Sequence, residues 1–339
     1  MNKLLAVVIM VVAVAGQALA QQKPQFTQYT LNNYLLNPAL SGIEDYADVK
    51  IGGRHQWSGL EGAPETYYTS IHMPLGKDMS NVYRRRKTAR AKESTTKRTN
   101  VYRRIRPHHG IGAIAMTTQT GMLKRSSLGF SYAYHQPLTR TLRVSAGVSP
   151  GLIQYNLDPS AIRAADMNDP ALYDGRINET KFDLTMGLWL YSQDFYIGVA
   201  GAQLVPSKRE FITSVTSPED ISGKLQKHYF TTAGYRVVVA PGLAVIPSVM
   251  VKMAQPSPVS VDTNVKVVYA DRVWGGASYR HKDSFSAMAG VSISPLLDVS
   301  YAYDLSTSPL GIANSGSHEV VVGFKLRNVA KVHCPQWAW

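Results

Sequence analysis

The stretch "VSVDTNVKVVY", Val259–Tyr269, alternates apolar and polar side chains along its length. Its odd positions carry Val, Val, Thr, Val, Val and Tyr, whereas positions 260, 262, 264 and 266 carry Ser, Asp, Asn and Lys. Successive side chains of a β-strand point to opposite sides, so a period of two predicts a strand with one apolar and one wet face.

The same alternation recurs through the rest of the carboxy-terminal part of the chain. It predicts strands over 260–270, 273–281, 284–293, 297–305 and 318–326. Short connections such as 270–272 and 281–283 favour antiparallel pairing of neighbours. Strands of this kind form either a two-sheet sandwich with its apolar faces packed together or a membrane barrel with its apolar face outside.

Three observations favour the barrel. The strands approach the roughly 9–11 residues that cross a bilayer. Tyrosines recur near strand ends, at Tyr269, Tyr279, Tyr301 and Tyr303, as an interfacial belt requires. The first residues read as an export signal: Lys3 precedes the apolar run Leu4–Ala15, and Ala18-Leu19-Ala20 has the pattern of a cleavage site. In lipid, only a closed barrel satisfies every strand edge.

Weaker patterns upstream predict further strands over 46–57, 65–75, 110–119, 125–136, 142–156, 181–191, 195–204, 227–239 and 243–254. The fold class is therefore an all-β transmembrane antiparallel β-barrel of about 14 strands with periplasmic termini. The expected divisions are a signal peptide (1–20), an amino-terminal periplasmic or plug segment (21–45), the barrel (46–326) and a tail (327–339). The longer connections, 157–180, 205–226 and 306–317, are expected to face outward.

Charged side chains on the polar faces of these strands are expected to point into the lumen. They are Asp48, Lys50, Arg54, Asp262, Lys266, Arg280, Asp298, Asp304, Glu319 and Lys325. Because neither sign dominates, mutual pairing in a hydrated interior is favoured over a charge-selective channel.

The segment 77–109 stands apart from the rest of the chain. It holds twelve Lys and Arg against Asp78 and Glu93, and so carries +10 of the formal net charge of +13. In an exported protein, nucleic acid is not the expected partner. The basic insert is either a solvated, disordered loop or a docking patch for an acidic periplasmic partner or anionic lipid headgroups.

The sequence offers no catalytic or metal-binding pattern. The nearest approaches, 281–284 and 315–318, lack the context of a catalytic triad, and the single Cys334 excludes zinc sites built from several thiolates. We expect no enzymatic activity, no cofactor and no metal. For Cys334 an inert thiol is favoured over intermolecular pairing or a free thiol close to lipid.

Several collinear segments resemble the PorP/SprF family of Bacteroidetes outer-membrane proteins. They are "PQFTQYTLNNYLLNPALSG" (24–42), "GRHQWSGLEGAPET" (53–66), "DPALYDG" (169–175), "HYFTTAGY" (228–235), "PSVMVK" (247–252), "GASYR" (276–280) and "SYAYDLSTSPLGIANSGSHEVVVGF" (300–324). The resemblance covers nearly the whole mature chain. Two features depart from the family pattern: the basic insert and the tail that follows Cys334.

Membership of this family implies an outer-membrane barrel of the type IX secretion and gliding machinery. It further implies that periplasmic ring lipoproteins and the C-terminal domain of secreted adhesin-like cargo are partners, with outer-membrane lipid around the barrel. A porin-like solute channel is the alternative. The candidate residues for partner binding or plug contact are Tyr29, Asn37, Pro38, Arg54, Gln56, Trp57, Gly62, Pro64, Arg84, Arg85, Arg86, Arg103 and Arg104. Arg54 and Gln56 are expected to hold residues 29–38 as a partial plug, and Trp57 to join an aromatic girdle.

Overall fold

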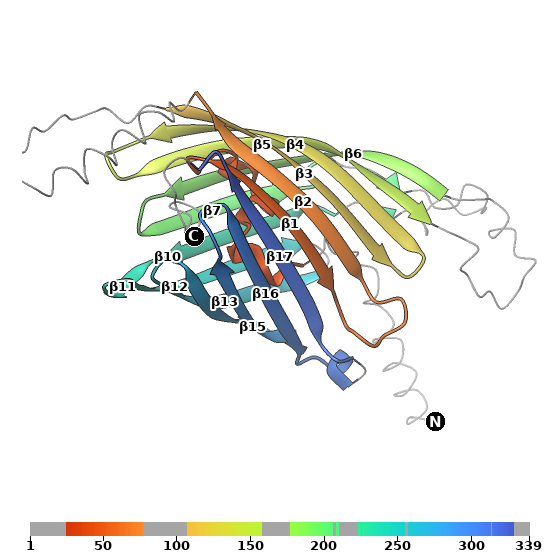
Figure 1. Cartoon of the computed structure of the whole chain (residues 1–339). Coiled ribbons are helices and arrows are strands. Elements are labelled where there is room, and N and C mark those ends of the chain that lie inside the picture. The colour runs from red at the N-terminus through yellow and green to blue at the C-terminus, as the bar shows by residue number, and fades with distance from the viewer. Residues whose placement is uncertain are drawn as a thin grey trace, which may run out of the picture.

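The computed structural model of the chain is a closed antiparallel β-barrel (Figure 1). It describes residues 25–76, 107–157, 177–205, 208–209, 223–224, 226–254, 257–312 and 314–328. The strands are β1 (Ala47–His55), β2 (Glu65–Leu75), β3 (His108–Thr120), β4 (Leu123–Pro137), β5 (Arg143–Leu157), β6 (Ile177–Tyr191), β7 (Phe195–Ala202), β8 (Lys208–Arg209), β9 (Gly223–Lys224), β10 (His228–Tyr235), β11 (Val237–Ala240), β12 (Leu243–Ala254), β13 (Ser257–Tyr269), β14 (Val273–Arg280), β15 (Ser284–Ser292), β16 (Leu297–Ser306) and β17 (Ser317–Leu326). In the described residues, no helix is both long and apolar enough to cross a membrane.

Neighbouring strands pair in chain order, and the first strand, β1, pairs with the last, β17. The ring is completed where β10 pairs with both β7 and β12. β11 continues along β12 beyond β10, so the two short strands together fill one position in the ring. The predicted barrel of fourteen strands is thereby confirmed; the small hairpin β8–β9 lies outside the ring.

The structure differs from the sequence-based strands in four places. Strand β6 begins at Ile177, inside the loop expected over 157–180. The strand expected over 227–239 is broken at Arg236, whose backbone N–H donates to the carbonyl of Asp194, and a register shift follows between Val238 and Ala240. Strand β3 begins at His108, inside the segment expected to be a loop. Strands β8 and β9 occupy part of the loop expected over 205–226.

The two faces of the barrel wall have opposite chemistry. Apolar side chains cover the outside, where Tyr67 and Phe130 are 62% and 61% exposed. Charged side chains on the inner face, such as Asp262 and Glu319, are about 1% exposed. An apolar exterior around a polar interior is the arrangement of a barrel that sits in lipid.

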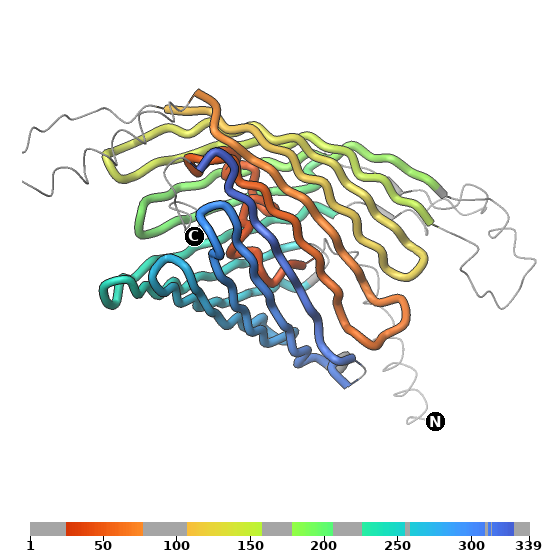
Figure 2. The backbone as a smooth tube through the Cα atoms, in the orientation of Figure 1, coloured from red at the N-terminus to blue at the C-terminus, as the bar shows by residue number. Residues whose placement is uncertain are grey.

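The interior of the barrel is occupied by residues 25–46, which we call the inner segment. Figures 1 and 2 show it in red, enclosed by the ring of strands. It forms three single turns of 3₁₀-helix, η1 (Thr27–Thr30), η2 (Asn33–Leu35) and η3 (Pro38–Leu40). Its aromatic and aliphatic side chains join those of the strands in two buried clusters, one around Tyr34 and Trp189 and one around Phe26 and Tyr68. The core of the protein is thus inside the barrel, around this segment.

Candidate functional site

The inner segment runs through the barrel from one end toward the other. It starts beside Arg54 and Glu319, close to the hairpin that joins β1 to β2 (lower right in Figure 1). It ends beside His108 and His135, close to the opposite ends of β3 and β4. Since short 3₁₀ turns have no stable existence alone, contacts with the barrel wall hold this course, and three levels of contact can be distinguished.

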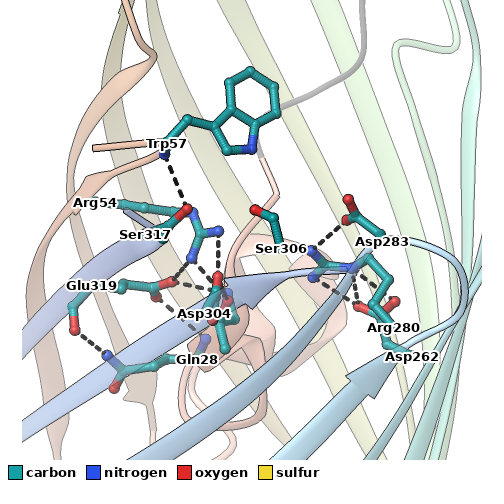
Figure 3. A network of polar contacts seen from close by, with 12 residues as sticks. Gln28, Arg54, Trp57, Asp262, Arg280, Asp283, Asp304, Ser306, Ser317 and Glu319 are labelled. Carbon is teal, nitrogen blue, oxygen red and sulfur yellow. Dashed lines mark hydrogen bonds and ion pairs between the residues drawn. The ribbon is translucent and has the colours of Figure 1, made fainter. Parts of the chain in front are cut away.

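At the first level, a buried ion cluster anchors η1 (Figure 3). Arg54 on β1 donates to Asp304 on β16 at 2.6 Å and to Glu319 on β17 at 2.9 Å. The same guanidinium donates to the hydroxyl of Thr27 at 2.8 Å. Thr27 in turn donates its N–H to Glu319 and its hydroxyl to Asp304, and the Gln28 amide donates to the Glu319 carbonyl oxygen. Side chains from β1, β16 and β17 therefore form one buried cluster with the inner segment.

The middle level consists of hydroxyl and amide contacts. The Tyr29 hydroxyl accepts a hydrogen bond from Asn264, and the Asn32 amide donates to Ser70 at 2.9 Å. The Tyr34 hydroxyl is hydrogen-bonded to Ser131. Burial raises the pKa of both phenols, that of Tyr34 to about 12 and that of Tyr29 well above its ordinary value, with Asp262 adding to the effect at Tyr29. Both side chains are therefore neutral at physiological pH.

Asn37 forms the most extensive single attachment of this level. Its side-chain amide donates to the carbonyl oxygens of Leu188 on β6 (3.0 Å) and Val199 on β7 (3.1 Å). Its side-chain oxygen accepts from the N–H of Ala39 and so caps η3, which begins with Pro38. Asn as N-cap followed by Pro in the first helical position is a favoured helix start. One side chain thus both shapes the segment and ties it to two strands.

At the third level, three histidines surround the turn at Ser41 and Gly42. His72 accepts the N–H of Gly42 at 3.3 Å, and His108 contacts the Gly42 carbonyl at 3.1 Å. His135 contacts the Ser41 carbonyl at 2.7 Å and stacks on His108, with ring centroids 4.3 Å apart. All three side chains are buried. They hold the segment where it turns toward β1.

Most of the other lumen charges form ion pairs, and the Lys266 ammonium lies over the Trp274 ring, 5.7 Å from its centroid. Arg280 makes a bidentate contact with Asp262, from Nε to Oδ1 and from Nη2 to Oδ2, each at 3.0 Å. Further pairs join Lys325 to Asp298 and Lys50 to Asp48, each at 2.5 Å. The charged side chains predicted to face the lumen do so. Ion pairing explains why acidic and basic side chains occur together on the inner face. Among the described residues, no group of three or more His, Cys, Asp or Glu could hold a metal ion.

The hairpin between β1 and β2 lies at the end of the barrel where the ion cluster is found, and its backbone is hydrogen-bonded to the neighbouring hairpins at Gly121 and Gly316. Gly59 and Gly62 have φ values of +95° and +71°, as expected for a tight turn. Gln56 donates its backbone N–H to the carbonyl of Pro64, so its backbone closes the hairpin. Trp57 lies in the turn after β1 with φ +51° and donates its N–H to the Ser317 hydroxyl at 3.1 Å.

The candidate residues therefore divide into three groups. Tyr29, Asn37, Pro38 and Arg54 all lie buried in the lumen, but Arg54 binds Thr27 rather than the expected residues 29–38. Gln56, Trp57, Gly62 and Pro64 belong to the adjacent hairpin. Arg84, Arg85, Arg86, Arg103 and Arg104, together with the signal peptide, most of the basic insert and Cys334, lie outside the described residues.

Sequence reasoning missed the glycines that make room for the inner segment. A Cβ on Gly110 would lie 1.8 Å from the Ser41 carbonyl oxygen, and one on Gly147 would lie 2.4 Å from the Ala39 nitrogen. Glycine inside a predicted strand often marks the close approach of another backbone. The positions of Gly110 and Gly147 inside β3 and β5 are therefore the sequence feature that could have indicated the inner segment.

The fold and the filled interior define an outer-membrane β-barrel whose lumen is occupied by its own amino-terminal segment. The model of the family described as "Type IX secretion system membrane protein PorP/SprF" matches residues 18–324, and the chain belongs to this family.

Comparison with solved structures finds other outer-membrane barrels at low sequence identity. Omp33 of Acinetobacter baumannii is 9% identical with a TM-score of 0.44, covering 84% of this chain and 100% of that one. The CymD monoaromatic hydrocarbon channel is 12% identical with a TM-score of 0.48, covering 90% and 94%. A Pseudomonas aeruginosa FadL homologue is 9% identical with a TM-score of 0.48, covering 90% and 95%. Comparison with curated proteins gives no match.

Proposed function

We propose that this chain is a non-enzymatic outer-membrane component of the type IX secretion system that docks other proteins. Its partners in this proposal are the periplasmic ring lipoproteins of the machinery and the C-terminal domain of secreted adhesin-like cargo. Residues 1–20 direct export and are removed. Family membership supports the system to which the barrel belongs.

The observation that carries the choice of docking over transport is the occupied lumen. The inner segment is anchored by the ion cluster of Arg54, by Asn37 and by the three histidines. A solute channel needs an open path with sites from which the solute can leave. A segment held at three levels through buried contacts obstructs such a path, so the alternative of a porin-like channel is disfavoured.

Deletion of the gene and complementation test the proposal. Cells without the barrel should lose surface display of a secreted cargo, and the intact chain should restore it. Affinity purification of the tagged barrel in mild detergent should recover ring lipoproteins or a large secreted protein. Unchanged cargo display in the deletion strain would contradict the secretion role.

Planar-bilayer conductance of the purified barrel addresses the alternative. The intact protein should conduct little. High, steady conductance of the intact barrel, together with recovery of the barrel alone from membranes at low salt, would favour the solute channel.

A further inference from the structure

Strand β6 is paired along its whole length on one side only. Its fifteen residues pair with β5 from Leu157↔Ile177 to Arg143↔Tyr191. On its other side, pairing with β7 covers only Met186 to Tyr191. One further backbone hydrogen bond, from Leu204 N–H to the Leu184 carbonyl, continues this side. Within the part of the chain that the structure describes, residues 178–183 of β6 have no strand beside them there.

The direction of the free backbone groups follows from that last hydrogen bond. Because the Leu184 carbonyl points to the β7 side and strand residues alternate, Asn178, Thr180 and Phe182 direct their N–H and C=O groups to the same side. The pairing of Leu184 with Pro150 on β5 is consistent with this direction. Proline has no N–H, so Leu184 and Pro150 cannot exchange the two N–H···O bonds of a hydrogen-bonded pair. Among the residues that the structure describes, these three present a row of backbone donors and acceptors without a pairing strand.

This open edge lies at the level where the outside of the barrel changes from apolar to polar. Phe182, Leu152 and Leu128 form one exposed apolar row across β6, β5 and β4. The next outward rows toward this end of the barrel are polar: Thr180, Gln154 and Ser126, then Asn178, Asn156 and Lys124. Unpaired backbone groups are strongly unfavourable in lipid, whereas water can hydrogen-bond to them. The free edge thus begins at the lipid boundary and extends into water, at the same end of the barrel as the β1–β2 hairpin.

The inward side chains of the edge add a preference for hydrogen-bond donors. Glu179, Lys181 and Asp183 face the interior side of β6, and Lys181 forms an ion pair with Glu179. One oxygen of Glu179, Oε2, and one of Asp183, Oδ1, have no hydrogen-bond partner. These two oxygens are acceptors that lack a donor. A strand placed alongside would supply cationic or hydroxyl donors to them at every second position.

We propose that residues 178–183 of β6 are a strand-docking edge that binds an extended segment of a partner protein with Lys, Arg or hydroxyl side chains at alternate positions. Backbone pairing supplies affinity and the alternate side chains supply selectivity, as in other cases of strand addition. The inference rests on the proposed function and deepens it, because it says how a secreted protein is held at this end of the barrel.

The test uses the purified full-length barrel in detergent and a fluorescent heptapeptide in which threonine and lysine alternate. Binding should be saturable and should weaken roughly tenfold or more in Thr180→Pro, which removes one edge N–H and places a ring against the incoming strand. The matched control, Thr180→Ala, keeps the N–H and should bind as the wild type does. A peptide that alternates threonine and glutamate should bind less well than the lysine peptide.

Folding of each variant is checked by the heat-dependent shift of the barrel on a gel. If Thr180→Pro does not fold, amide hydrogen exchange of the wild type decides: the lysine peptide should slow exchange at Asn178, Thr180 and Phe182. Absence of saturable binding, equal binding to a folded Thr180→Pro variant, or unchanged exchange would overturn the inference. These measurements need no secretion machinery, so their failure is distinct from a failure of the cargo-display experiment.

Discussion

Gly187 on β6 lies directly against Asn37 of the inner segment: a Cβ built on Gly187 would come within 2.0 Å of the Asn37 side-chain oxygen. That oxygen caps Ala39, and the adjoining amide bridges β6 and β7. The absence of a side chain at one wall position therefore permits the attachment that orders η3. The barrel wall at Gly187 and the side chain of Asn37 therefore fit closely together.

Replacement of Gly187 by Ala tests this complementarity. The added methyl group must displace Asn37, and overpacking of this kind costs about 1–3 kcal/mol. The free energy of unfolding in urea, followed by tryptophan fluorescence in lipid vesicles, should fall by that amount. The control is Gly275→Ala, where the nearest atom to a new Cβ is 3.8 Å away. Equal stability of the two variants would show that Asn37 is not held as described.

Arg54→Ala should be strongly destabilising. It leaves the carboxylates of Asp304 and Glu319 buried without their cation, and loss of one partner of a buried ion pair costs about 3–5 kcal/mol. Urea unfolding of the purified barrel measures this loss. Arg236→Ala is the comparison, because the pair between Arg236 and Asp271 is exposed and such pairs contribute about 0–1 kcal/mol. A similar small effect at both arginines would contradict the anchoring role of Arg54.

The raised pKa of Tyr34 predicts a stability change at high pH. The folded protein holds the phenol proton to about pH 12, whereas an unfolded tyrosine loses it near a pKa of about 10. The folded state therefore binds this proton more tightly than the unfolded state does. The contribution of the Tyr34 phenol to the free energy of unfolding is complete below about pH 10 and is lost as the pH rises toward 12. The difference in unfolding free energy between wild type and Tyr34→Phe should shrink over this window. A difference that stays constant to pH 12 would refute the effect.

The basic insert gives a salt-dependent prediction. Changing Arg84, Arg85, Arg86, Arg103 and Arg104 to Ser should weaken copurification of periplasmic partners and reduce the salt sensitivity of the association, because exposed charges are screened within about 10 Å at 0.1 M salt. The same five positions changed to Lys preserve charge and should retain binding. If the Ser and Lys variants recover partners equally at every salt concentration, the insert is not a docking patch.

The barrel could be predicted from the sequence because lipid imposes a strict alternation on each strand. The segments ending at Tyr269, Ser292 and Leu326 were placed closely, and the parity that put Asp262 and Glu319 inside was right, since a one-residue shift would expose either to lipid.

The course of the inner segment could not be predicted in the same way. Its 3₁₀ turns have no repeating period, and its contacts join residues far apart in sequence, such as Thr27 with Asp304. The tie expected between Arg54 and residues 29–38 lies instead at Thr27. The histidine contacts at Ser41 and Gly42 depend on three separate strands, which no local pattern relates.

The Arg54 cluster has a consequence for the order of assembly. Arg54 and Glu319 are paired across β1 and β17, the first and last strands of the ring, so their ion pair crosses the seam where the barrel closes. Until β17 has been synthesised and brought alongside, the Arg54 guanidinium has no Glu319 to pair with, and Thr27 lacks the acceptor for its N–H. The cluster can therefore form only once β17 lies beside β1, so closure of the ring and anchoring of the inner segment depend on the same residue, Glu319.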